Sequence, residues 1–200
     1  MAGTTNQSIK ELVYEGILND IILGVYPANS ILNERTLVEK YGGSKTSVRE
    51  ALVQLCSEGI LKNIPRFGYQ LPVITPSELS AIIEYRIILE TGALKKTMKI
   101  ITQEQIDRLN SHAKHAGALA QKHDITTHWS TNMEFHLMLC ECCSNQFMFK
   151  ALNDALKFCS IGANQYFNKS WETGNPTDAN GHVKIVDAIR HHDEKLAEEL

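Results

Sequence analysis

The 200-residue sequence lacks several features that would place it in other classes of protein. No apolar run approaches the roughly 20 residues that a membrane-spanning helix needs, and the polar first residues carry no signal-peptide pattern. Five cysteines are an odd number and do not suggest a disulfide framework, so we expect free thiols and a reducing, cytoplasmic location. Cys140, Cys142 and Cys143 lack a second ligand pair at zinc-knuckle spacing, which favours buried or half-buried thiols.

The sequence also lacks an excess of positive charge, with a formal net charge of −3. Acidic and basic residues balance over residues 1–72, so the net negative charge lies in residues 73–200. Balanced charge still allows nucleic-acid binding, because the local field rather than the net charge attracts phosphate. It predicts weaker non-specific binding than a basic domain would show. The cations that we expect on the binding surface of this first part are Arg35, Lys45, Arg49, Lys62 and Arg66.

A helix-turn-helix pattern is present in residues 33–59. Asn33 and Ser44 are good N-caps for two short helices, and Gly42 and Gly43 supply a tight turn between them. Apolar residues of the second helix recur at i, i+3, i+4 and i+7, which makes one buried face. This pattern fits insertion into a DNA major groove, and it also fits an ordinary amphipathic helix with solvated charges. The polar residues on another face of this helix are Lys45, Thr46 and Arg49.

A hairpin is predicted after the second helix of this pattern. Gly59 ends the helix in a left-handed conformation, and residues 60–64 and 69–71 favour two short strands. The turn between the strands places Arg66 at its tip. A further helix from Gln7 to Gly24 precedes the pattern. This order of elements, a helix, a helix-turn-helix and a hairpin, predicts a winged helix-turn-helix domain that comprises residues 1–72.

The rest of the chain is predicted to be helical. Two prolines within residues 72–76 make a stiff connector, and we place the linker at residues 73–76. Beyond it we find no convincing strand, so residues 77–200 should form an antiparallel all-helical bundle and the whole chain should be mainly α. The polar segment 168–180 is predicted to be a loop. The expected helices are 77–98, 102 to about 121, 126–143, 145–166, 178–191 and one that begins at residue 193.

The run from Leu32 to Leu71 resembles the DNA-binding domain of the GntR family of bacterial transcription regulators. That family shows approximately L-P-S-E-R-x-L-A-x-x-x-G-V-S-R-x-x-V-R-E-A-L-x-x-L-x-x-x-G-L, followed by a Gly-rich wing. The sequence departs from it at Asn33, Gly43, Lys45 and Phe67. Lysine lacks the bidentate fork of the arginine that the family favours at position 45, which leaves the operator sequence open. The residues in step are Leu32, Glu34, Arg35, Leu37, Gly42, Ser44, Val48, Arg49, Glu50, Ala51, Leu52, Leu55 and Gly59.

Residues 77–200 resemble the all-helical effector-binding and dimerisation domain (FCD) of the FadR-type subgroup of this family. The resemblance therefore covers essentially the whole chain. It implies that the last helix continues beyond Leu200 with a third histidine, so we expect the chain to be truncated there. The resemblance to this domain rests on three local patterns: Tyr85-Arg86-x-x-Leu89-Glu90, Asn132-Met133-Glu134-Phe135-His136-x-x-Leu139 and His182-x-x-Ile185-x-x-Ala188-Ile189-x-x-x-Asp193.

The resemblance implies a divalent-metal site. In the resembling domain an aspartate and three histidines bind the ion, and Asn132, His136 and His182 occupy three of these four positions. Asn132 and His136 are four residues apart and can face the bundle interior together. A neutral amide is a weaker ligand than a carboxylate, and neutral imidazoles suit zinc or nickel. His128 is either a substitute for the missing histidine or a solvated residue near a helix start.

Arg86 is the remaining candidate for an effector site. An arginine in a helical cavity can bind a carboxylate effector through two parallel hydrogen bonds. The alternative is an ion pair with Glu90 at i+4. The expected effector site comprises Arg86, Asn132, His136 and His182.

These observations predict a sequence-specific transcription regulator, a repressor rather than an enzyme, that binds double-stranded operator DNA as a homodimer and responds to a small organic acid. One alternative is an interaction module with a degenerate pocket and no metal. The other is a metal-dependent hydrolase, against which the sequence shows no nucleophile elbow, P-loop or paired carboxylates beside the histidines. The expected DNA-contacting residues are Arg35, Ser44, Lys45, Thr46, Arg49, Arg66 and Gly68.

Overall fold

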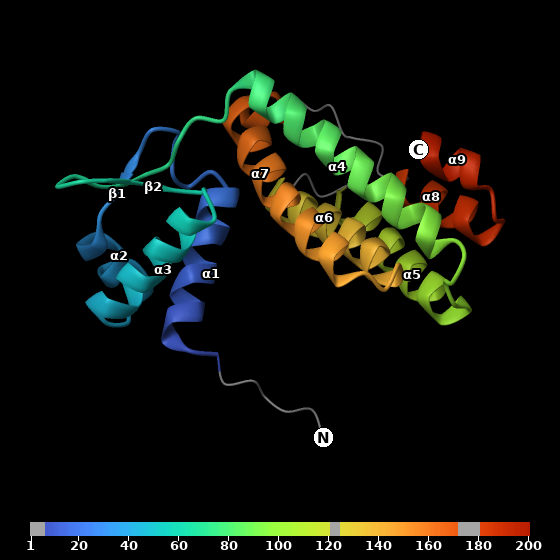
Figure 1. The fold of residues 1–200 in the computed structure, drawn as a ribbon, viewed down its shortest axis with the longest axis horizontal. Helices are drawn as coiled ribbons and strands as arrows, with labels where there is room; N and C mark the ends of the chain where they lie inside the picture. Colours follow the sequence, from blue (N-terminus) through green and yellow to red (C-terminus); the bar gives the residue numbers. More distant parts are fainter. Residues whose placement is uncertain (1–6, 121–124, 172–180) are drawn as a thin grey trace. The chain divides into compact units, whose positions relative to one another are not determined.

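The computed structural model describes residues 7–120, 125–171 and 181–200, except the side chains of 120, 125–129 and 167–171. Two compact units are present (Figure 1). The first holds Met1–Thr75 with Ile161–Tyr166, and the second holds Pro76–Ser160 with Phe167–Leu200. The boundary between residues 75 and 76 falls inside the proline-rich segment.

The first unit is a winged helix-turn-helix, as predicted. Three helices pack together, and a three-stranded antiparallel sheet of order β1-β3-β2 forms the wing. The strand β1 was not predicted, and it pairs Leu32 with Tyr69. The elements are α1 (Ile9–Ile22), β1 (Ile31–Leu32), α2 (Glu34–Tyr41), α3 (Lys45–Ser57), β2 (Lys62–Ile64) and β3 (Gly68–Gln70).

Local signals fix the turn between α2 and α3. The Asn33 side chain accepts a hydrogen bond from the Arg35 backbone N–H at 2.9 Å, and the Ser44 hydroxyl accepts one from the backbone N–H of Ser47 at 3.1 Å. Both predicted N-caps are therefore confirmed. Gly42 and Gly43 have φ values of 74° and 82°, a region that favours glycine. The predicted apolar face of α3 is buried through Val48, Ala51, Leu52 and Leu55.

The second unit is helical throughout its described residues. Helix α6 packs against both α4 and α5, and α8 packs against α5 and α9. Phe135 on α6 is fully buried in an apolar core that also contains Leu109 and Val186. The elements are α4 (Pro76–Thr97), α5 (Gln103–Ala120), α6 (Ile125–Cys142), α7 (Gln146–Trp171), α8 (Gly181–Arg190) and α9 (Glu194–Glu199).

One predicted boundary is wrong. The sequence favoured a loop over residues 168–180, but α7 continues to Trp171. The polar residues 168–170 do not end a helix by themselves, and the strong breakers Gly174 and Pro176 lie further along the sequence. The rest of that predicted loop, residues 172–180, lies outside the described residues, as does the predicted start of the following helix at 178.

The cysteines are free thiols, as expected. Cys140, Cys142, Cys143 and Cys159 are buried, and Cys56 is half-buried. Burial raises the pKa of the Cys140 thiol to about 12, so this sulfur stays protonated and unreactive near neutral pH. Across the described helices, none combines the length and apolar character needed to cross a membrane.

Candidate DNA-binding surface and helical-domain pocket

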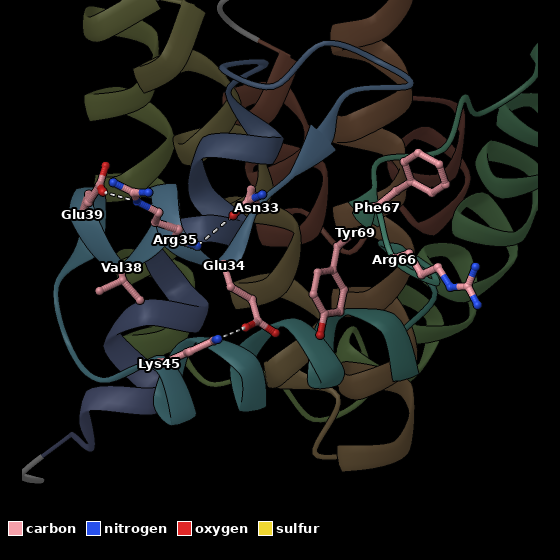
Figure 2. A pocket seen from close by; sticks show the side chains of 10 residues that line it. Asn33, Glu34, Arg35, Val38, Glu39, Lys45, Arg66, Phe67 and Tyr69 are labelled. Carbon is pink, nitrogen blue, oxygen red and sulfur yellow. Dashed lines mark hydrogen bonds and ion pairs between the residues drawn. The ribbon is translucent and has the colours of Figure 1, made fainter.

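A groove of about 520 Å³ lies on the first unit, where the N-terminal ends of α2 and α3 meet the wing (Figure 2). Arg35 is almost fully exposed, with 88% of its side chain accessible, and its Nε donates to Glu39 Oε1 at 3.1 Å. Lys45 is also strongly exposed. The groove is therefore a concave surface with accessible cations, which suits a polyanion. Four predicted DNA-contacting residues line it: Arg35, Lys45, Arg66 and Gly68.

The wing tip projects an arginine and an aromatic ring. Arg66 has φ of 71°, and its side chain points away from the groove centre in Figure 2. Phe67 is 72% exposed, which is unusual for an aromatic side chain. Gly68 has φ of 129°, and a Cβ there would lie 2.6 Å from the Leu32 carbonyl oxygen. Glycine at position 68 is therefore required for the close approach of β3 to β1, whatever its contact with DNA.

Arg49 is bound by a carboxylate that sequence reasoning did not assign to it. Its Nε donates to Glu34 Oε1 at 2.8 Å and its Nη2 to Glu34 Oε2 at 2.9 Å, which is a bidentate pair. Lys45 Nζ lies 4.0 Å from Glu34 Oε2. The hydrogen bonds from Arg49 lower the pKa of the Glu34 carboxyl below its usual value, and a hydrogen bond from Tyr69 acts in the same direction.

The remaining predicted contacts are at the start of α3. The Ser44 hydroxyl is engaged in the helix cap, where it accepts from Ser47. Thr46 is exposed on the first turn of the same helix. Neither residue lines the groove.

In the second unit, the structure brings four predicted or neighbouring polar residues together. Arg86 Nε on α4 donates to Glu90 Oε1 at 2.7 Å, which is the i+4 ion pair anticipated as an alternative. Glu90 Oε1 also lies 3.2 Å from His136 Nδ1 on α6. The rings of His136 and His182 meet edge to face, with centroids 5.2 Å apart. The sequence patterns did not predict the Glu90–His136 contact, because it joins two different helices.

Burial governs the charges of this cluster. It raises the pKa of the Glu90 carboxyl, although Arg86 partly opposes the effect. It lowers the pKa of His136 well below the usual value, with further contributions from Arg86 and His182. His136 is therefore neutral near pH 7 and can donate its Nδ1–H to Glu90.

A cavity of about 290 Å³ opens beside this cluster. Its lining includes the apolar Leu94, Leu139 and Ile185 together with Glu90 and His136. Arg86, Asn132 and His182 are outside the described lining, so the effector site expected from the sequence is only partly at the cavity wall. Arg86 is connected to the cavity through its hydrogen bond to Glu90.

The donor set does not complete the implied metal site. His136 and His182 converge, but the nearby Glu90 carboxylate is already bound by Arg86. Asn132 is half-buried one turn before His136 and offers only a neutral amide. Among the described residues, no group of three or more His, Cys, Asp or Glu side chains is arranged to hold a metal ion. The His128 side chain lies outside the described residues.

A winged helix-turn-helix with exposed cations, followed by an all-helical domain with a pocket, is the architecture of a DNA-binding transcription regulator. Residues 9–70 match the model for bacterial regulatory proteins of the gntR family, and residues 81–200 match the FCD domain. The chain belongs to the GntR family of bacterial regulators, in the FadR-type group that carries an FCD domain. Regulators of this family bind operator DNA.

Proteins that are similar to this chain include regulators with names that fit this family. The HTH-type transcriptional regulator YdhC of Bacillus subtilis is 23% identical over 190 residues, which cover 93% of this chain and 83% of that protein. The repressor NanR of Enterobacter sp. (strain 638) is 26% identical over 187 residues, covering 80% of this chain and 68% of that protein. The structure of McbR/YncC from E. coli is 19% identical with a TM-score of 0.82, covering 96% of this chain and 91% of that one, and shows the same fold.

Proposed function

We propose that the protein is an operator-binding repressor that acts as a homodimer and is released from DNA by a small carboxylic acid. The observation that carries the DNA-binding part is the groove at the N-terminal ends of α2 and α3, with Arg35, Lys45 and Arg66 around it. Each subunit would place α3 in a major groove and its wing beside the backbone. A relative named as a repressor supports the direction of regulation.

The effector proposal is supported by the Arg86–Glu90 pair beside the helical cavity. A guanidinium has five N–H donors in a planar fork, and a carboxylate matches that fork. Glu90 already accepts from Arg86 Nε at 2.7 Å, so an effector carboxylate would share Arg86 with Glu90 or replace it. The acid regulates DNA binding only if it binds one dimer geometry better than the other.

The homodimer is supported by helix α4. Ile83, Tyr85, Ile87 and Ile88 are exposed although they lie in the middle of a long helix. Exposed apolar residues so concentrated are typical of a contact surface. Ile88→Asp should dissociate the dimer, and Ser80→Asp on the same helix adds the same charge at an exposed polar position as a control. Sedimentation of the wild-type protein as a monomer at micromolar concentration would contradict the proposal.

We also propose that zinc or nickel binds only weakly beside Asn132, His136 and His182. Two neutral imidazoles and an amide lack the negative charge that a carboxylate ligand supplies. Asn132→Asp should therefore tighten binding, and His136→Ala should remove it. Calorimetric titration with Zn²⁺ or Ni²⁺ measures both. Equal heats from the wild type and His136→Ala would mean that the metal binds elsewhere.

The central experiment uses a duplex selected by the wild-type protein from a random library, with a panel of small carboxylic acids. At least one acid should weaken binding of the wild-type protein to this duplex. Arg86→Lys keeps the charge but loses the fork, so it should bind DNA normally and respond less to the acid. Arg190→Lys is the control, because Arg190 pairs with Asp187 on α8 at 2.6 Å.

The outcomes separate the parts of the proposal. A wild-type protein that selects no duplex from the library would overturn the regulator function. A protein that selects a duplex but responds to no acid and no metal would be an interaction module with a degenerate pocket.

A further inference from the structure

A carboxylate lies at the centre of the DNA-binding surface, where it would repel phosphate. Glu34 begins α2, and only 18% of its side chain is exposed. Its neighbours are much more exposed, at 58% for Arg49 and 74% for Lys45. Figure 2 shows Glu34 pointing between Lys45 on α3 and Tyr69 on β3. One acidic group therefore contacts the recognition helix and the wing at the same time.

Stability alone does not account for this arrangement. An ion pair with an exposed arginine contributes little to folding, because water screens it and both side chains lose freedom. An acidic residue in the first turn of α2 also interacts favourably with the helix dipole, but a contact to Arg49 is not needed for that. The cost is electrostatic, since Glu34 lowers the positive potential of a surface that binds DNA. Folding stability therefore gives little reason for a carboxylate at this position.

More than half of the Arg49 side chain stays exposed although it contacts Glu34. Glu34 occupies one edge of the Arg49 guanidinium, through Nε at 2.8 Å and Nη2 at 2.9 Å. The adjacent edge, formed by Nη1 and Nη2, still carries two parallel N–H donors, and two such donors match the O6 and N7 acceptors of guanine. A fixed arginine loses less conformational freedom on binding than a mobile one. It also fits an incorrect base pair poorly, because it cannot reorient.

We propose that Glu34 is a positioning residue for operator recognition, which orients Arg49 and offsets part of the cationic charge so that the protein discriminates between DNA sequences. This inference rests on the proposed DNA-binding function. It predicts that loss of the Glu34 charge has opposite effects on two kinds of DNA. Affinity for the operator falls because Arg49 is no longer oriented. Affinity for unrelated DNA rises because a repulsive charge has been removed.

The test compares Glu34→Gln with a matched control on the same helix. Glu39 also lines the groove and pairs with an arginine, Arg35, at 3.1 Å, but it does not contact Arg49. Glu39→Gln therefore removes the same charge from the same surface. Fluorescence anisotropy measures the affinity of each protein for the duplex selected by the wild type and for a duplex of shuffled sequence. A salt titration of the shuffled duplex measures the number of ions released.

The expected result is a change in discrimination, which is the ratio of the two affinities. Glu34→Gln should weaken binding to the selected duplex by about tenfold and strengthen binding to the shuffled duplex by about twofold or more. Glu39→Gln should strengthen both and leave the ratio unchanged. Equal ratios for the two variants would overturn the proposal, because Glu34 would then act as a charge alone. A wild-type ratio near one would instead overturn the DNA-binding function.

A double-mutant cycle tests whether Glu34 acts through Arg49. Arg49→Lys retains the charge and loses the fork, so it should lower discrimination without altering the affinity for shuffled DNA. In that background Glu34→Gln should have little further effect on the ratio. Additive losses would mean that Glu34 acts through another group. If Glu34→Gln fails to fold, Arg49→Lys decides the question, and unchanged discrimination in that variant would overturn the proposal.

Discussion

Each unit of the protein contains an arginine bound by a glutamate, and the two pairs have different surroundings. Glu34 lines an open groove, and more than half of the Arg49 side chain that it binds is exposed. Arg86 and Glu90 are 20% and 23% exposed and lie beside a cavity of about 290 Å³. The same pair of residue types is therefore largely open to water in one unit and mostly covered, beside a small cavity, in the other.

The difference indicates what each arginine can bind. An exposed guanidinium is accessible to a polymer such as DNA, and its existing partner can remain in place. A mostly covered guanidinium beside a cavity suits a small molecule, which would share Arg86 with Glu90 or replace Glu90. Exposure also determines the energetic role of each pair, because screening weakens the first far more than the second.

The largest expected effect is on the buried pair. Arg86→Ala should leave Glu90 without its cation and destabilise the second unit by about 2–3 kcal/mol, because both side chains are mostly covered. Both tryptophans, Trp129 and Trp171, belong to this unit, so urea unfolding followed by their fluorescence reports on it. Arg49→Ala should shift the unfolding midpoint far less.

A second variant identifies the cause of that destabilisation. Replacing both partners, as Arg86→Met with Glu90→Leu, should recover most of the lost stability because no buried charge is left unpaired. A double variant as unstable as Arg86→Ala would show that packing around Arg86, rather than the charge, dominates.

The next largest effect is on the affinity for DNA, and it should arise only from changes to the exposed Arg49–Glu34 pair. Arg49→Ala should weaken binding to the selected duplex by about tenfold if Arg49 contacts a base. Arg86→Lys should leave this affinity unchanged without effector. Anisotropy titrations at fixed salt measure both, and a loss of less than about twofold for Arg49→Ala would remove this residue from the interface.

A smaller effect is expected from the aromatic packing that supports the buried cluster. The Phe135 ring stacks on His182 with centroids 4.0 Å apart and lies edge-on to His136. Phe135→Leu keeps an apolar side chain but loses the stacking, at a cost of about 1 kcal/mol. Urea unfolding checks the value, and an unchanged midpoint would show that this stacking does not stabilise the second unit.

The smallest effect is the pH dependence of the exposed pair. Arg49 holds the pKa of Glu34 below its unfolded value, so the pair stabilises the first unit above the unfolded pKa and loses that contribution as the pH falls through the folded pKa. Glu34→Gln should lower the melting temperature by about 2–4 °C at pH 7. Below the lowered pKa the two proteins should melt together, and a constant difference at acid pH would contradict this assignment.

Much of the fold could be predicted because its signals are local. The caps at Asn33 and Ser44 and the paired glycines at 42 and 43 each act within a few residues, and each is present in the structure. Thr102 and Gln105 form another such local signal, because they exchange the hydrogen bonds of a capping box at the start of α5. The apolar face of α3 followed directly from its spacing.

The features that were missed depend on pairing between distant segments. The strand β1 has only two residues and exists because it pairs with β3. Glu34 was noted for its family pattern, but its contact with Arg49 requires α2 and α3 to meet at a particular angle. Glu90 was noted in a family pattern and as an i+4 partner of Arg86, but its contact with His136 was not predicted. Sequence spacing reveals neighbours on one helix and not neighbours across helices.

Selection of duplexes from a random library by the purified wild-type protein tests the account most directly. A dimer that presents two copies of α3 should enrich a pseudo-palindromic sequence with half-site centres about 10 base pairs apart, or a multiple of this distance. The same selection with Glu34→Gln should give a weaker consensus from the same protein concentration. A pool with no enriched sequence, or a consensus without two-fold symmetry, would contradict the account.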